Sequence, residues 1–259
     1  MDFKGESLGQ AELQAMDTLD PQLRDHALLT EQAFNLTGEV LGLGWLPETP
    51  LREVSQSRKV LTALLVRFSN DLRSAALLAL RGYPIQAVAL VASMYEVAYA
   101  IVYIGADDSL AQKWIDHNDP IRPFRKIKDL TREVWKRLDV TNADGQTKAQ
   151  YRVYQQLCWA KHANPLFQTQ QTYQLHDGNV VARNGPDTSD SAIRAAWFAL
   201  EHAARLSSLA VAAYVESHIP ADQRGDLKNK IEMIGAGSQE LARKAAPRFG
   251  TEDPFPGKW

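Results

Sequence analysis

Apolar residues recur at helical spacing along most of the chain. Val60, Leu64, Phe68 and Leu72 follow one another every four residues, which places them on one stripe of a helix. Polar residues fill the positions between them, as on a helix that packs with one face. The same periodicity predicts helices over residues 21–43, 50–80, 83–104, 107–117, 124–139, 147–163, 190–218 and 221–245.

Glycine and proline mark where these helices begin and end. Pro21 is expected to open the first helix, and Thr49 to cap the second with Pro50 at its first position. Gly82 ends the helix before it, and Pro84 starts the next one only two residues later. Two long helices joined by so short a turn must lie antiparallel.

One segment alternates in the manner of strands rather than helices. The stretch TYQLHDGNVVAR contains Asp177-Gly178, a favoured two-residue hairpin turn because glycine accepts the positive φ that the turn needs. We therefore expect an all-α fold, a bundle of long antiparallel helices with one small β-hairpin inserted near residues 172–182. Its expected organisation is a polar N-terminal arm at 1–20, a single helical domain at 21–246 and a tail at 247–259.

Composition narrows the class of protein. The chain has 259 residues, of which 45% are hydrophobic and 23% charged, with a net charge of -2. It therefore lacks a global basic field for nucleic acid. A single cysteine, Cys158, excludes an internal disulfide framework and a Cys-rich zinc site. The six histidines show no metal-ligand spacing, and no phosphate loop or other cofactor motif is present, so neither a metal nor a cofactor is expected.

Residues 83–105 are long and apolar enough to cross a bilayer, but they carry Gln86 and Glu96 and lack a basic cluster at the far end. A buried central helix explains this segment better than a membrane span. The N-terminus also lacks the basic-then-apolar order of a signal peptide. A cytoplasmic location without membrane contact is therefore expected.

Glu96 shares its helix face with small residues, which lets a neighbouring helix approach closely. A carboxylate pressed against protein needs a cation or donors. Arg205, in the mostly apolar helix 190–218, is its best candidate partner. Glu96 is then either a buried anchor that holds helices in register or a residue of a catalytic or ligand-binding site.

The stretch QQLCWAKHANPL, residues 155–166, ends an apolar helix on ionisable side chains. One helix face collects Tyr151, Tyr154, Cys158 and His162. Lys161 and His162 occupy the final turn before Asn164-Pro165, where the helix dipole favours cations, so an ordinary helix end is one interpretation. The other is a polar site in which His162 faces Glu96 or a ligand. Cys158 is a weak candidate nucleophile, because buried cysteines are usually inert.

The segment RPFRKIKDLTREVWKR, residues 122–137, is the one local basic patch. Its charges are either a solvated helix face or a contact surface for RNA or phosphate.

Two segments resemble a family of uncharacterised bacterial helical proteins: LLALRGYPIQAVALVASMYEVAYAIVYI and YRVYQQLCWAKHANP. The matching residues are Arg81, Gly82, Tyr83, Ser93, Glu96, Tyr154, Leu157, Cys158, His162 and Pro165. Ala92 stands where the family usually has an arginine. That family is in turn similar to the HEPN-like superfamily of helical bundles, many of whose members are ribonucleases of toxin and antiphage systems.

The HEPN ribonuclease motif is an arginine, about four to six residues, and then a histidine, usually at a dimer interface. Here Arg152 precedes His162 by nine intervening residues, and Arg194 precedes His202 by seven. Neither pair fits. The resemblance therefore implies a homodimeric module of bacterial defence or stress that binds a small ligand or a partner. Its candidate binding residues are Tyr151, Tyr154, Cys158, Asn164, Arg205 and Arg81.

The alternative is an atypical HEPN-type ribonuclease or toxin acting on RNA. His162 would then be the general acid and base for attack of the 2′-hydroxyl on phosphate. Lys161 would stabilise charge in the transition state, and Glu96 would orient the histidine. Lysine cannot reproduce the two-pronged contact of the missing arginine.

Overall fold

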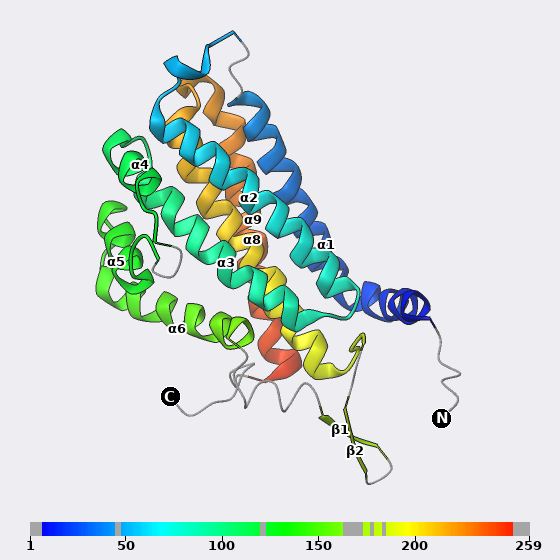
Figure 1. The fold of residues 1–259 in the computed structure, drawn as a ribbon. Coiled ribbons are helices and arrows are strands. Elements are labelled where there is room, and N and C mark those ends of the chain that lie inside the picture. Colours follow the sequence, from blue (N-terminus) through cyan, green and yellow to red (C-terminus); the bar gives the residue numbers. More distant parts are fainter. Residues whose placement is uncertain are drawn as a thin grey trace.

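The computed structural model describes residues 7–44, 48–119, 123–162, 173–176, 179–182 and 185–250. These residues form a bundle of long helices (Figure 1), so the expected all-α class is confirmed. In chain order the helices are α1 Leu8–Leu43, η1 Leu51–Glu53, α2 Gln56–Leu80, α3 Pro84–Ile104, α4 Asp108–Ile115, α5 Ile127–Arg137, α6 Ala143–Lys161, α8 Asp190–His218, η2 Ala221–Gln223 and α9 Arg224–Phe249.

The centre of the bundle is α3. It packs on α2 and α8, while α4, α5 and α6 lie on its other side (Figure 1). Val88, Val91, Ala98 and Ile101 of α3 are fully buried. Among the described residues, only this helix has the length and apolar composition of a membrane span, and 72% of its most apolar window is buried inside the protein. Core helices of soluble proteins meet the same criterion.

The first helix begins earlier than its proline suggests. Ser7 is the N-cap, and its hydroxyl accepts from the backbone N–H of Gln10, whose side chain accepts in turn from the Ser7 backbone. The helix then runs through Pro21, so the expected start at Pro21 is wrong. Proline lacks an N–H and crowds the preceding turn, which bends a helix. The deep-blue beginning of α1 is correspondingly angled away from the bundle in Figure 1.

The second helix is capped by Ser55, whose hydroxyl accepts from the Arg58 N–H. The expected cap at Thr49 is wrong, because a short 3-10 turn, η1, occupies the residues after Pro50. The predicted hairpin of α2 and α3 is present, with Gly82 at φ 84° in its turn. A Cβ on Gly82 would lie 2.8 Å from Pro186 Cβ, so the residue must be small as well as left-handed.

Two short strands lie between α6 and α8. β1, Tyr173–His176, pairs antiparallel with β2, Asn179–Ala182, with His176 opposite Asn179. The expected turn Asp177-Gly178 lies outside the described residues. On the far side of this segment, the backbone N–H of Asp187 donates to Gly82 O at 2.8 Å. The entry to α8 is thereby fixed to the turn between α2 and α3.

Candidate functional site

Glu96 lies where α3 meets α6, and two side chains of α6 share one of its oxygens. Lys161 Nζ donates to Glu96 Oε1 at 2.8 Å, and the Tyr154 hydroxyl donates to the same atom at 2.7 Å. The Glu96 side chain remains 33% exposed. The carboxylate therefore has both a cation and a neutral donor, which is what a partly buried charge requires.

The register of α6 brings these side chains to Glu96. The helix is capped by the side chain of Asn142, which accepts from the Gly145 N–H. From there, Tyr154, Cys158 and Lys161 follow at spacings of four and three residues and therefore share a face. Lys161 is the last helical residue, a position where the helix dipole favours a cation.

The thiol at this face is held in its neutral form. Burial raises the pKa of Cys158 most strongly, and the charge of Glu96 raises it further. A hydrogen bond with Tyr154 and the charge of Lys161 act in the opposite direction without overcoming burial. Since the thiolate is the reactive form, Cys158 is unsuited to act as a nucleophile here.

Aromatic rings of α3 pack against the Glu96 cluster, which consists of Glu96, Tyr154, Cys158 and Lys161. The Tyr154 ring lies 5.1 Å from that of Tyr95, which stacks on Tyr99 at 4.3 Å. Burial raises the pKa of Tyr95 to about 12, and its hydroxyl lies 3.3 Å from Thr131 Oγ1. Burial also raises the pKa of Tyr154, ahead of its hydrogen bonds to Cys158 and Glu96. These phenols stay protonated at neutral pH and act as fixed donors.

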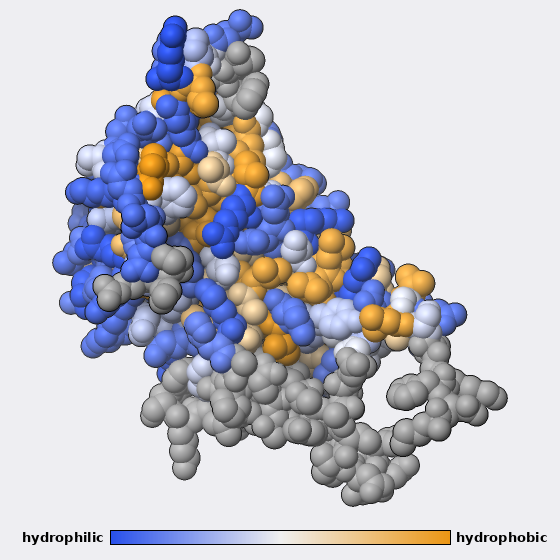
Figure 2. All heavy atoms as spheres, in the orientation of Figure 1, coloured by the Kyte–Doolittle hydropathy of each residue, from blue (hydrophilic) through white to orange (hydrophobic). Residues whose placement is uncertain are grey.

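On its other side Glu96 borders a pocket of about 430 Å³ between α2, α3, α4 and the segment leading into α5. Three aromatic rings line it, those of Trp114, Phe124 and His117. The charged residues of the lining besides Glu96 are Arg67, Arg125 and Asp119. Arg125 is fixed in place, because its Nη1 donates to the Tyr103 hydroxyl at 2.7 Å. The helices around this side, α4 to α6, present a mostly hydrophilic surface (Figure 2).

His162 does not contact Glu96. It is the C-cap of α6, and its backbone N–H donates to Cys158 O at 2.9 Å. Its side chain is exposed and forms no hydrogen bond or ion pair with the described part of the chain. Lys161, the preceding residue, contacts the Glu96 carboxylate instead, because it shares a helix face with Tyr154 and Cys158. Asn164, the next predicted site residue, lies outside the described residues.

Two other predicted binding residues, Tyr151 and Arg81, lie at different distances from Glu96. The Tyr151 ring is 6.1 Å from that of Tyr154, with Lys128 Nζ 5.7 Å over its face. Arg81 is exposed at the turn between α2 and α3 and pairs with Glu12 at 3.4 Å. It therefore belongs to a different part of the bundle.

The expected pair of Arg205 and Glu96 is not formed. Arg205 Nη1 lies 4.0 Å from Glu201 Oε1, one helical turn earlier on the same helix. Arg205 therefore pairs with the Glu201 carboxylate of its own helix and not with Glu96. Glu201 was not among the predicted site residues, although it is buried in the structure, with 7% of the residue exposed.

The pocket beside Glu96 was also missed as a site. Arg125 and Phe124 stand in the basic segment at 122–137, so a signal existed, but nothing in the sequence placed that segment over Glu96. Arg67 and Trp114 read as ordinary residues of amphipathic helices. Within the described ranges, no group of three or more His, Cys, Asp or Glu side chains could hold a metal ion.

No family model, curated protein or solved structure matches this chain. The site is therefore interpreted from its own geometry.

Proposed function

We propose that this protein is a HEPN-like helical module that binds a mononucleotide in the pocket beside Glu96. The observation that carries the proposal is the combination of charges and rings around that pocket. Arg67 and Arg125 supply cations, Trp114 and Phe124 supply flat apolar surfaces, and Glu96 supplies an acceptor. A volume of about 430 Å³ lies in the range of small-molecule sites.

Each part of a mononucleotide has a matching partner here. Arginine presents donors in a planar fork that suits phosphate. Aromatic rings stack on a base, whichever base it is. Among the described residues, Tyr154 and Lys161 both contact Oε1 of Glu96, so Oε2 can accept from a ribose hydroxyl or a base amino group.

The HEPN-like part of the proposal rests on the all-α bundle and on the matching residues Glu96, Tyr154 and Cys158, which lie together at the junction of α3 and α6. The missing arginine-to-histidine motif favours a binding module over a nuclease. A role in bacterial defence or stress, a cytoplasmic location and a homodimeric state belong to the same proposal.

Titration calorimetry with AMP, GMP, CMP and UMP tests the binding site, with orthophosphate and adenosine as separate arms for the two halves of the ligand. We expect Arg67→Gln and Glu96→Gln to weaken binding about tenfold each, equivalent to about 1.4 kcal/mol. Arg73→Gln is the matched control, because Arg73 is an exposed residue of the same helix that does not line the pocket. Absence of binding by every nucleotide, or equal loss in the two arginine variants, would contradict the proposal.

A second candidate is the atypical ribonuclease, which is favoured by the exposed His162 side chain, without a partner among the described residues. Against it, the charge of Lys161 is already paired with Glu96 at 2.8 Å. Incubation with mixed cellular RNA would decide, comparing His162→Ala and Lys161→Ala with Lys148→Ala, an exposed lysine of the same helix. Cleavage lost only in the first two variants would establish the nuclease. Cleavage absent throughout, or equal in all, would exclude it.

A further inference from the structure

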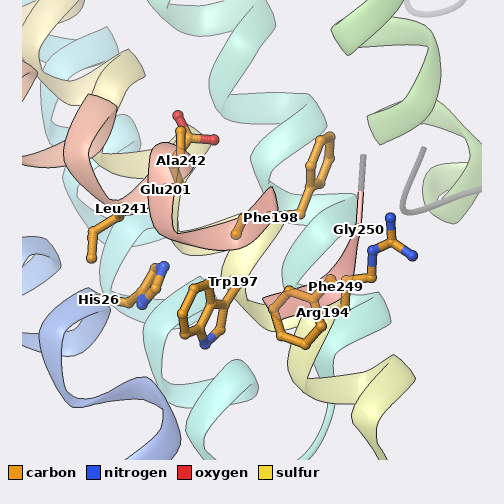
Figure 3. Close-up of a pocket in the computed structure, with 10 residues that line it drawn as sticks. His26, Arg194, Trp197, Phe198, Glu201, Leu241, Ala242, Phe249 and Gly250 are labelled. Carbon is orange, nitrogen blue, oxygen red and sulfur yellow. The ribbon is translucent and has the colours of Figure 1, made fainter. Parts of the chain in front are cut away.

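A second pocket lies between α1, α8 and α9 (Figure 3). Its volume is about 150 Å³. Aromatic and aliphatic side chains form most of the wall, and Figure 3 shows His26 and Trp197 together at one end with Arg194 at the other.

His26 in this wall is buried without a hydrogen-bond partner. Only 2% of the residue is exposed, and neither Nδ1 nor Nε2 has a partner among the described residues. Burial lowers its pKa to about 4, so at neutral pH the ring is uncharged and carries one donor and one acceptor. Buried polar groups are normally paired, and an unpaired one that lines a cavity indicates a missing partner.

The His26 ring is fixed in position. It lies 4.3 Å from the Trp197 ring, whose Nε1 donates to Gln22 O at 3.0 Å. The Arg248 guanidinium covers the Trp197 and Phe249 rings, 5.0 Å from each centroid. The polar atoms of His26 are therefore held at the wall of the pocket rather than free to turn to solvent.

Glu201 adds an acceptor to the same wall. Its Oε2 lies 2.6 Å from His202 Nδ1, which also lies 2.9 Å from Phe198 O. Both neighbouring atoms only accept, so Nδ1 carries the proton. The remaining oxygen, Oε1, forms an ion pair with Arg205 Nη1 at 4.0 Å, which is longer than a hydrogen bond, so it can still accept one. Although burial opposes it, the charges of His202 and Arg205 keep the pKa of Glu201 low, so the carboxylate is ionised.

The pocket therefore suits a ligand with a flat apolar body and a polar edge. The aromatic walls of Trp197, Phe198 and Phe249 suit a ring. A cavity of about 150 Å³ holds a molecule the size of benzene. The edge must donate to Glu201 and exchange a hydrogen bond with neutral His26.

We propose that this pocket binds an amino-substituted nitrogen heteroaromatic ring, of the aminopyridine or aminopyrimidine class. The amino group donates to Glu201 Oε1, and the ring nitrogen accepts from His26. This site is separate from the pocket at Glu96 and independent of the function proposed for it.

A ligand series on the wild-type protein provides the first test. The probes are 2-aminopyridine, aniline, which lacks the ring nitrogen, and toluene, which lacks both polar groups. Binding is followed by the indole N–H signal of Trp197 in nuclear magnetic resonance spectra, assigned with a Trp197→Phe variant. We expect 2-aminopyridine to bind at least about tenfold more tightly than toluene, because a site built for hydrogen bonds discriminates against a ligand that lacks them. Equal binding of the two, or no change at Trp197, would overturn the proposal.

Variants provide the second test. We expect His26→Phe and Glu201→Gln each to weaken 2-aminopyridine binding about tenfold or more, with folding checked by circular dichroism. Glu240→Gln is the control, because it removes an exposed carboxylate of α9 that does not line the pocket. Unchanged affinity in both folded variants would also overturn the proposal. If either variant fails to fold, the wild-type ligand series still decides.

Discussion

Glu96 and Glu201 are the same residue type in two helices of one bundle, and their surroundings differ. The Glu96 side chain is 33% exposed and meets a lysine and a phenol from another helix. The Glu201 side chain is 9% exposed, and its ion-pair partners, His202 and Arg205, come from its own helix. Glu96 therefore joins two helices at the edge of an open pocket. Glu201 is a charge inside the bundle, stabilised almost entirely by local contacts.

The largest effect expected from this difference is on stability. Glu201→Ala should lower the free energy of unfolding by about 3 kcal/mol, because it removes the buried acceptor that His202 and Arg205 share. Glu96→Ala should cost about 1 kcal/mol or less, since its partners can turn to solvent. Urea denaturation of the two variants measures both values. Equal losses would show that exposure does not separate the two sites.

A second effect follows from pH. Burial lowers the pKa of His26 to about 4, and burial with the charge of Arg58 does the same for His218. As pH falls below the unfolded value of about 6.5, the unfolded chain binds these protons first, so stability falls until about pH 4. The full loss is about 3 kcal/mol for His26, which is 2% exposed, and smaller for the more exposed His218.

The check is a series of urea midpoints between pH 7 and pH 4 for wild type and His26→Phe. The variant should lose less stability over this range, because it lacks one of the two titrating groups. Parallel curves for the two proteins would contradict the assignment of this pH dependence to His26.

The third effect is the coupling of Glu96 with Lys161. A double-mutant cycle of Glu96→Gln and Lys161→Met should give about 0.5–1 kcal/mol, the range of partly exposed ion pairs. A coupling well above that range would mean that this edge of the bundle is as desolvated as the surroundings of Glu201.

The smallest effect concerns Cys158. Burial and the charge of Glu96 raise the pKa of the thiol, whereas Lys161 lowers it. Alkylation by iodoacetamide at neutral pH should therefore be slow, slightly faster in Glu96→Gln and slower still in Lys161→Met. Slower alkylation in Glu96→Gln, or faster alkylation in Lys161→Met, would show that these charges do not act on the thiol as the geometry requires.

The sequence predicted the helices well where apolar spacing was strong, as in α2 and α3. It failed where local chemistry competed, because Pro21 lies within a helix that Ser7 had already started and Ser55 caps α2 in place of Thr49. For the site, the positions of Glu96, Tyr154 and Cys158 on their helix faces predicted them as candidate site residues. The sequence could not decide between Lys161 and His162, since a rotation of one residue about α6 determines which side chain reaches the carboxylate.

Other parts of the two sites depend on contacts between distant segments. In the sequence, His26 does not differ from other polar residues of its helix. The packing of α8 and α9 against α1 is what places it in the wall of a pocket. Arg205 was assigned to Glu96 because both stand among small residues, yet Glu201 lies one turn away on the same helix. Which residues share a wall is set by the rotation and crossing of helices, and apolar periodicity does not fix that.

The central position of α3 also has a consequence for synthesis on the ribosome. Its main cover, α8, begins at Asp190, 86 residues after α3 ends at Ile104. At a translation speed of about 5–20 residues per second, synthesis of α8 begins roughly 4–17 s after α3 has been completed. Until then α3, the most apolar of the described helices, cannot pack against α8. During this interval only α2 and the shorter helices that follow can shield it. The nascent chain is therefore most prone to aggregation and to chaperone capture before residue 218 has been made.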